Sequence, residues 1–148
     1  VNFLKPRITV FALGTNDARI MAKEQPQPLA DSNTNGYGFS DFVSSVSGAV
    51  DSALKTSKCV ILINTQLGFG ADTLTPMISA RGGLVNAWLS QYASNRADRR
   101  VRVGDWNWFS RQHRDWFIAD GVHHTATGQD QYRSFIVTKV SEALKNGC

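Results

Sequence analysis

Short apolar runs recur along this chain of 148 residues, each followed by a longer stretch of mixed polar and apolar positions. Three of the runs, 7–13, 59–64 and 101–106, are rich in β-branched and aromatic residues. This composition is typical of buried strands. Pro6 precedes the first run, and it is compatible with a strand there because the first residue of a strand can lack a backbone donor.

Between and after these runs, apolar residues recur at spacings of three and four. This pattern predicts amphipathic helices over about 39–54, 78–92 and 132–144. Residues 17–38 contain prolines and glycines among Asn, Ser and Gln, so we expect a loop there. A connection of that length often carries function.

Two polar residues are predicted to begin helices. Ser40, in the stretch GFSDF, has the side chain and position of an N-cap for the helix after it. Thr127, with Asp130 three residues later, has the pattern of an N-cap pair for the last helix.

The alternation of strands and helices predicts a parallel sheet with right-handed crossovers, and therefore an α/β fold. In such sheets, ligands bind beyond the carboxyl ends of the strands. This rule points to residues 14–19, 65–75 and 107–127 as the segments that carry the chemistry.

One candidate pair lies in the last of these segments. Asp120 and His123 stand three residues apart, and Gly121 allows a tight turn between them. An aspartate that accepts from one ring nitrogen of a histidine fixes the tautomer and stabilises the imidazolium, so the other nitrogen can act as a general base. Taken alone, however, the spacing favours an ordinary turn with a surface histidine.

A second candidate lies at the end of the first strand, in the stretch FALGTND. The amide NH₂ of Asn16 can donate to a developing oxyanion, a contribution worth about 2.7–4 kcal/mol where single donors have been removed. Asn and Asp after a strand are also ordinary turn residues, and alone that interpretation is favoured. The occurrence of both candidates at the predicted active edge favours catalysis instead.

At this point the chain resembles the SGNH (GDSL-type) hydrolase superfamily. The stretch ALGTND resembles the family's oxyanion block, and DGVHHTATGQDQYRSFI resembles the C-terminal block that holds the Asp and His of its triad. The stretches VILINT, VNAWLSQYA and VRVGDW resemble the strands and helix between them, so the resemblance covers nearly all of a single domain, 1–148.

The resemblance implies a three-layer α/β/α, flavodoxin-like parallel sheet and hydrolysis of an ester by a serine nucleophile. Asn16 would donate in the oxyanion hole, His123 would be the base and Asp120 would orient it. Members include esterases, lipases and carbohydrate acetylesterases. The expected substrate is therefore an ester or an acylated carbohydrate, and no cofactor is expected.

The chain also departs from the family pattern. In that family the serine lies in a Gly-Asp-Ser turn after an earlier strand, and this chain resembles only the C-terminal two thirds, so the sheet is expected to lack its N-terminal strands. The stretch ADSNTNGYG offers Ser32 as a substitute, but the prolines before it leave no buried strand to support a nucleophile. Ser32 is therefore interpreted as a loop serine. His124 stands where a proline is common in the family.

Three hypotheses stay open. In the first, the nucleophilic serine lies outside this chain, on a preceding segment or on another polypeptide. In the second, Ser32 or another serine of this chain is the nucleophile. The third hypothesis is a degenerate, non-catalytic module that binds a carbohydrate, an acyl ligand or a protein. A truncated sheet would also expose an edge that invites pairing, so a dimer or swapped assembly is expected.

Several further residues are candidates for substrate binding. Gly14 ends the first strand, and Trp106, Trp108, Trp116 and Phe117 precede the Asp–His pair. Aromatic side chains in such a position can wall an acyl or sugar pocket, and core packing explains them equally well.

Composition adds limits rather than a function. The chain has 42% hydrophobic and 19% charged residues, as globular proteins do, and no apolar run approaches the ~18–20 residues of a membrane span. Its net charge is +4, much of it from residues 96–102, which we interpret as a solvated helix–strand junction and not as a nucleic-acid site.

Cys59 and Cys148 lack C-x-x-C spacing, so no metal site is expected. A disulfide in an exported protein and two free thiols both stay open. A secreted or periplasmic location is favoured over a cytoplasmic one.

Overall fold

The computed structural model describes residues 5–24, 37–67, 69, 75–97 and 99–148. Within these ranges the predicted strands and helices follow one another in the predicted order, with one additional helix after the first strand and two short helical segments before the last helix. In chain order the elements are β1 (Ile8–Ala12), α1 (Thr15–Glu24), α2 (Phe39–Ala53), β2 (Cys59–Ile63), α3 (Thr75–Ser94), β3 (Val101–Gly104), α4 (Trp106–Ser110), the 3₁₀ turn η1 (Arg114–Trp116) and α5 (Ala126–Lys145).

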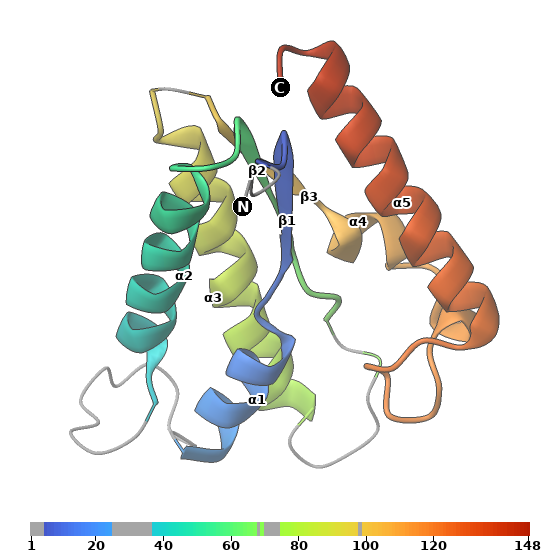
Figure 1. Cartoon of the computed structure of the whole chain (residues 1–148). Helices are drawn as coiled ribbons and strands as arrows, with labels where there is room; N and C mark the ends of the chain where they lie inside the picture. The colour runs from blue at the N-terminus through green and yellow to red at the C-terminus, as the bar shows by residue number, and fades with distance from the viewer. Residues whose placement is uncertain (1–4, 25–36, 68, 70–74, 98) are drawn as a thin grey trace.

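The three strands form one parallel sheet in the order β1-β2-β3, which confirms the predicted α/β fold. Ile8 stands opposite Cys59, and Val60 stands opposite Val101. Helices α1, α2 and α3 cover one face of the sheet, while α4 and α5 lie on the other (Figure 1).

The central strand β2 divides the core in two. All of its residues are buried, because helices cover both faces of the sheet. Val60 and Leu62 pack in the cluster that includes Phe42 of α2, while the alternate residues pack with Phe135 of α5. This period of two is the geometry of a strand, and it explains why residues 59–63 form a continuous apolar run.

Strand β1 is an outer strand of the described sheet. Ile8, Val10 and Phe11 are only half-buried, and Ala12 is exposed. Among the described residues, β1 pairs with β2 alone. Its other side therefore presents backbone donors and acceptors that no strand of the described sheet uses.

One prediction is wrong: residues 17–24 are helical, not part of a loop. Ala18, Met21 and Ala22 are buried at helical spacing, and α1 packs against α3 through this face. The prolines and glycines that indicated a loop all follow this helix in the sequence. Residues 25–36, among them Ser32, lie outside the described part of the chain.

Both predicted helix caps are also wrong, each by two residues. Gly38 is the N-cap of α2, and its backbone N–H donates to the carboxylate of Asp41 at 2.7 Å, so Ser40 lies inside the helix. For α5 the cap is Thr125, whose hydroxyl accepts from the N–H of Gly128 at 3.2 Å.

A disulfide joins Cys59, at the start of β2, to Cys148 after α5, with Cα atoms 5.6 Å apart. The alternative of two free thiols is thereby excluded. The bond ties the end of α5 to the sheet that it covers. In the described part of the chain, no helix is both long and apolar enough to cross a membrane.

Candidate functional site

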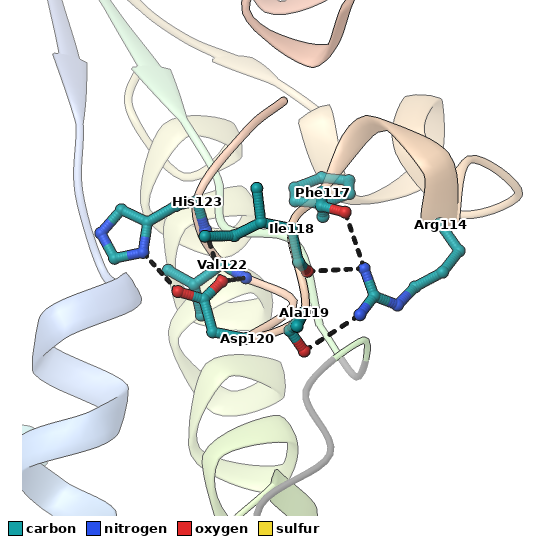
Figure 2. A network of polar contacts seen from close by, with 7 residues as sticks. All are labelled: Arg114, Phe117, Ile118, Ala119, Asp120, Val122 and His123. Atoms are coloured by element: carbon teal, nitrogen blue, oxygen red, sulfur yellow. Dashed lines mark hydrogen bonds and ion pairs between the residues drawn. The ribbon is translucent and has the colours of Figure 1, made fainter. Parts of the chain in front are cut away.

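The turn after η1 brings Asp120 and His123 together. Oδ2 of Asp120 lies 2.6 Å from Nδ1 of His123, and Oδ1 accepts from the backbone N–H groups of Val122 and His123 at 2.8 and 3.0 Å (Figure 2). Gly121 between them has a φ of 70°, a left-handed conformation that glycine adopts without strain. One carboxylate therefore holds both the histidine ring and the turn that carries it.

These hydrogen bonds lower the pKa of Asp120 to about 2, the bond from the His123 ring being the largest cause and those from the backbone next. A carboxylate that accepts several hydrogen bonds is stabilised in its charged form. Asp120 is therefore ionised at neutral pH, and it can hold a proton on Nδ1 of His123.

Arg114 fixes the turn from the other side. Its guanidinium donates to the carbonyl oxygens of Phe117, Ile118 and Ala119 at 2.9, 2.7 and 3.0 Å (Figure 2). The N–H of Ile118 donates to the carbonyl of His123 at 2.9 Å, which closes the loop. A planar fork with several donors suits this task, because it constrains several carbonyls at once.

The side chain of His123 is 77% exposed. In Figure 2 its ring points away from the turn, on the side where β1 and α1 are drawn. Among the described residues, no hydrogen bond joins Nε2 to a serine or threonine hydroxyl. Nε2 is thus open to solvent and to a substrate.

The turn between β1 and α1 depends on Gly14. This residue has a φ of 110°, and a Cβ there would lie 2.5 Å from Cγ1 of Val85 in α3. Its carbonyl accepts from the N–H of Ala18 as α1 begins. Asn16 follows in the first turn of α1, is exposed, and its side chain makes no hydrogen bond within the described chain.

A network of side-chain amides holds the end of β2. The amide of Asn86 pairs with both backbone groups of Thr65, donating to its carbonyl at 2.8 Å and accepting from its N–H at 3.1 Å. Asn64 donates to Asp105 at 2.8 Å and accepts from the N–H of Asn107 at 2.9 Å. The sequence signal for Asn86 is a polar residue on the apolar face of a helix.

Residues at the carboxyl ends of β1, β2 and β3 surround a cavity of about 110 Å³. Leu13 and Thr15 of the β1–α1 turn and Gly121 and Val122 of the Asp120–His123 turn contribute to its wall, whereas Asn16, Asp120 and His123 are not among its lining residues. Its lining consists of Ala12, Leu13, Thr15, Ile63, Asn64, Thr65, Gln66, Trp106, Phe117, Gly121, Val122, His124 and Tyr132.

His124, rather than His123, lines this cavity. Its ring meets those of Trp106, Phe117 and Tyr132 at centroid distances of 5.5, 5.0 and 4.9 Å. Burial, and secondly the neighbouring His123, lower the pKa of His124, because both disfavour the charged imidazolium. Burial raises the pKa of Tyr132. Both groups are therefore neutral at neutral pH.

The aromatic candidates separate into two groups. Trp106 is 3% exposed and, with Phe117, lines the cavity, while Trp116 packs beside Trp106 in the core. Trp108 is 60% exposed and lies outside the cavity lining, and the guanidinium of Arg111 covers its ring at 3.7 Å. The position of Trp108 thus differs from that of the cavity-lining aromatic residues.

Within the described ranges, His, Cys, Asp and Glu side chains form no group of three that could hold a metal ion. The described groups at these strand ends are an Asp–His pair, an exposed Asn at a helix start and a small, partly aromatic cavity. Comparisons of the chain with protein-family models, with curated proteins and with solved structures gave no match.

Proposed function

We propose that this protein is the Asp–His-bearing part of an SGNH-type ester hydrolase. The observation that carries the proposal is the contact of 2.6 Å between Asp120 and Nδ1 of His123, which leaves Nε2 exposed on a turn whose residues Gly121, Val122 and His124 line the cavity at the strand ends. An imidazole held in this tautomer by an ionised carboxylate is the arrangement of a general base.

In the proposed reaction, Nε2 of His123 takes the proton of a serine hydroxyl while the oxygen attacks the ester carbonyl. Asp120 stays ionised throughout and stabilises the imidazolium. The side-chain NH₂ of Asn16 donates to the oxyanion of the tetrahedral intermediate. Nε2–H then protonates the leaving alcohol, and a water molecule repeats the two steps to release the acid.

The serine is either Ser32 or a residue outside this chain. Ser32 lies beyond the described residues, so no distance to His123 bears on it. For a serine on a separate segment, we propose an approach along the outer side of β1, one of the two edges of the described sheet.

The cavity favours a small acyl group. Its volume of about 110 Å³ matches a small acyl group such as acetyl. The proposed substrate is therefore a short-chain ester, such as an acetylated carbohydrate, with Trp106 and Phe117 against the acyl group.

The decisive experiment compares this chain with a longer one that includes the coding sequence upstream of Val1. Each is incubated with p-nitrophenyl acetate and with a fluorophosphonate probe, and labelled peptides are identified by mass spectrometry. We expect a labelled serine in at least one protein, at Ser32 or upstream. The variant His123→Ala should lose labelling and hydrolysis, whereas His113→Ala, at another exposed histidine, should keep both.

A non-catalytic binding module is the second candidate. It is favoured by the absence, among the described residues, of a hydroxyl bonded to Nε2 of His123. This candidate predicts that neither protein is labelled or hydrolyses the ester, while short-chain carboxylates still bind. That result would overturn the proposal that the protein is an ester hydrolase.

A further inference from the structure

A second hollow lies at the opposite end of the sheet from the candidate site. It has a volume of about 930 Å³ and is formed where β2 and β3 begin, where α3 ends and where the chain leaves α5. We call it the basic groove. Its lining consists of Lys58, Cys59, Ala93, Ser94, Arg96, Ala97, Arg99, Arg100, Val101, Arg102, Asn146 and Gly147.

The groove concentrates positive charge. Lys58, Arg96, Arg99, Arg100 and Arg102 line it, and none of the described lining residues is acidic. Like charges gathered around one hollow raise the local potential, because field lines concentrate in a concave surface of low dielectric.

Three of these cations form no ion pair within the described part of the chain. Arg96 forms an ion pair with Asp51 at 3.0 Å. Lys58, Arg99 and Arg102, in contrast, form no ion pair with any described residue. No described carboxylate is paired with these three groups, so an anion in the groove would relieve their mutual repulsion.

The backbone around the groove is held in place before any ligand binds. Arg100 donates to the carbonyl oxygens of Leu54, Ser57 and Lys58, each at 2.8 Å, and so fixes the connection that leads into β2. Arg102 donates to the carbonyl of Asn146 at 2.8 Å. The disulfide of Cys59 joins the same two segments, so binding would require little ordering of the backbone.

The lining also indicates the class of anion. The groove is too large for one phosphate or sulfate, since it has room for a chain of several charged units. None of the described lining residues is aromatic, so the groove offers no surface for stacking nucleic-acid bases. The disulfide indicates an oxidising compartment, where nucleic acids are not the common polyanion.

We propose that the basic groove binds an anionic polysaccharide, through sulfate or carboxylate groups spaced along the sugar chain. Lys58 and Arg99, which are exposed, and Arg102 would contact these groups, while Arg100 positions the wall. This site is separate from the Asp120–His123 site, and the proposal does not depend on ester hydrolysis.

The test uses a heparin octasaccharide, which carries sulfates, and an oligogalacturonide of the same length, which carries only carboxylates. Binding is measured by calorimetry at 50 mM and 200 mM NaCl, with a neutral octasaccharide and single-stranded DNA as comparisons. We expect at least one acidic octasaccharide to bind, with an affinity that falls as salt rises. The neutral octasaccharide should not bind, and the DNA should bind more weakly.

The variant Lys58→Gln/Arg99→Gln should weaken binding at least about tenfold, because each removed charge contact contributes strongly. The matched control Arg19→Gln/Lys23→Gln removes the same charge from exposed positions of α1 and should change binding by less than about twofold. Equal losses in both variants, tighter binding of DNA, or no binding of either acidic octasaccharide at 50 mM NaCl would overturn the proposal.

A further variant, at Arg99, separates a loss of binding from a loss of folding. Its φ of 51° lies in the left-handed region, where a non-glycine residue is strained. Arg99→Gly removes the cation and relieves the strain, so the thermal midpoint should hold or rise while affinity for the acidic octasaccharide falls. If this variant binds as tightly as the unaltered protein, Arg99 is not part of the site and the proposal fails.

Discussion

Nδ1 of His123 and Oδ2 of Asp120 lie 2.6 Å apart in a turn that leaves much of both side chains exposed. Their contact does not depend on a buried setting. It depends on the turn itself, whose N–H groups bond the same carboxylate and whose carbonyls are held by Arg114. Four predictions follow from this site and from the elements that position it.

Asp120→Asn should lower the kcat for ester hydrolysis by about 10³–10⁴-fold in the form of the protein that carries the nucleophile. An amide cannot stabilise the imidazolium, and it favours the wrong tautomer of His123. Asp115→Asn is the matched control, because Asp115 is exposed and its carboxylate lies 3.9 Å from another histidine, His113. Equal kcat values for the two variants would contradict the assigned role of Asp120.

The carboxyl of Asp120 should titrate near pH 2, which carbon NMR of the labelled protein measures directly. In His123→Ala the midpoint should rise but stay below the ordinary ~3.9, because the backbone N–H bonds remain. Since the folded-state pKa is depressed, Asp120 stabilises the fold above about pH 4. This stabilisation is lost as the pH falls toward 2. A midpoint that does not move in His123→Ala would contradict the contact.

His124 should lower the free energy of unfolding as the pH falls below the ordinary pKa of a histidine. Burial lowers the pKa of His124, so the folded chain binds fewer protons than the unfolded chain once the pH drops through about 6.5. Denaturant unfolding at pH 7.5 and 5.5 should therefore show a smaller loss of unfolding free energy in His124→Asn than in the unaltered protein. Equal losses in the two proteins would contradict this role of His124.

Gly128→Ala should destabilise the protein by about 1–3 kcal/mol or more. A Cβ at this position in the first turn of α5 would lie 1.9 Å from the carbonyl oxygen of Trp116, a backbone atom that cannot move aside cheaply. Gly48→Ala, inside α2, meets nothing within 4 Å and should stabilise by about 0.4–1 kcal/mol. Urea unfolding of both variants gives the comparison.

The apolar runs predict the strands well, because a strand covered on both faces must be continuously apolar, as Cys59–Ile63 is. The first helix is harder to predict. It is short, and the prolines and glycines that follow it suggest a loop that begins too early. Its buried Ala18, Met21 and Ala22 become informative only once α3 is seen packed against them.

The candidate site was predictable only in part. The Asp120–His123 contact is local, so the spacing of three residues and the glycine made it a candidate, although the spacing alone favoured an ordinary turn. The role of Asn86 and the place of His124 depend on segments far apart in the sequence, which meet only in the folded chain. The caps were predicted two residues too late because Gly38 and Thr125 are themselves favourable N-cap residues that precede Ser40 and Thr127.

The disulfide divides the chain into a closed ring and an open arm. Cys59 and Cys148 are 89 positions apart, and the ring that they close contains β2, α3, β3 and α5, with Asp120 and His123. Gly14 and Asn16 lie on the arm, with β1, α1 and α2. Apart from the backbone that leads from α2 into β2, the two halves of the candidate site are therefore joined by non-covalent contacts, chiefly the pairing of β1 with β2, the packing of α1 on α3 and the hydrogen bonds from Arg7 to the carbonyl of Cys148. Detachment of the arm would take the site apart while every covalent link of the ring stayed intact.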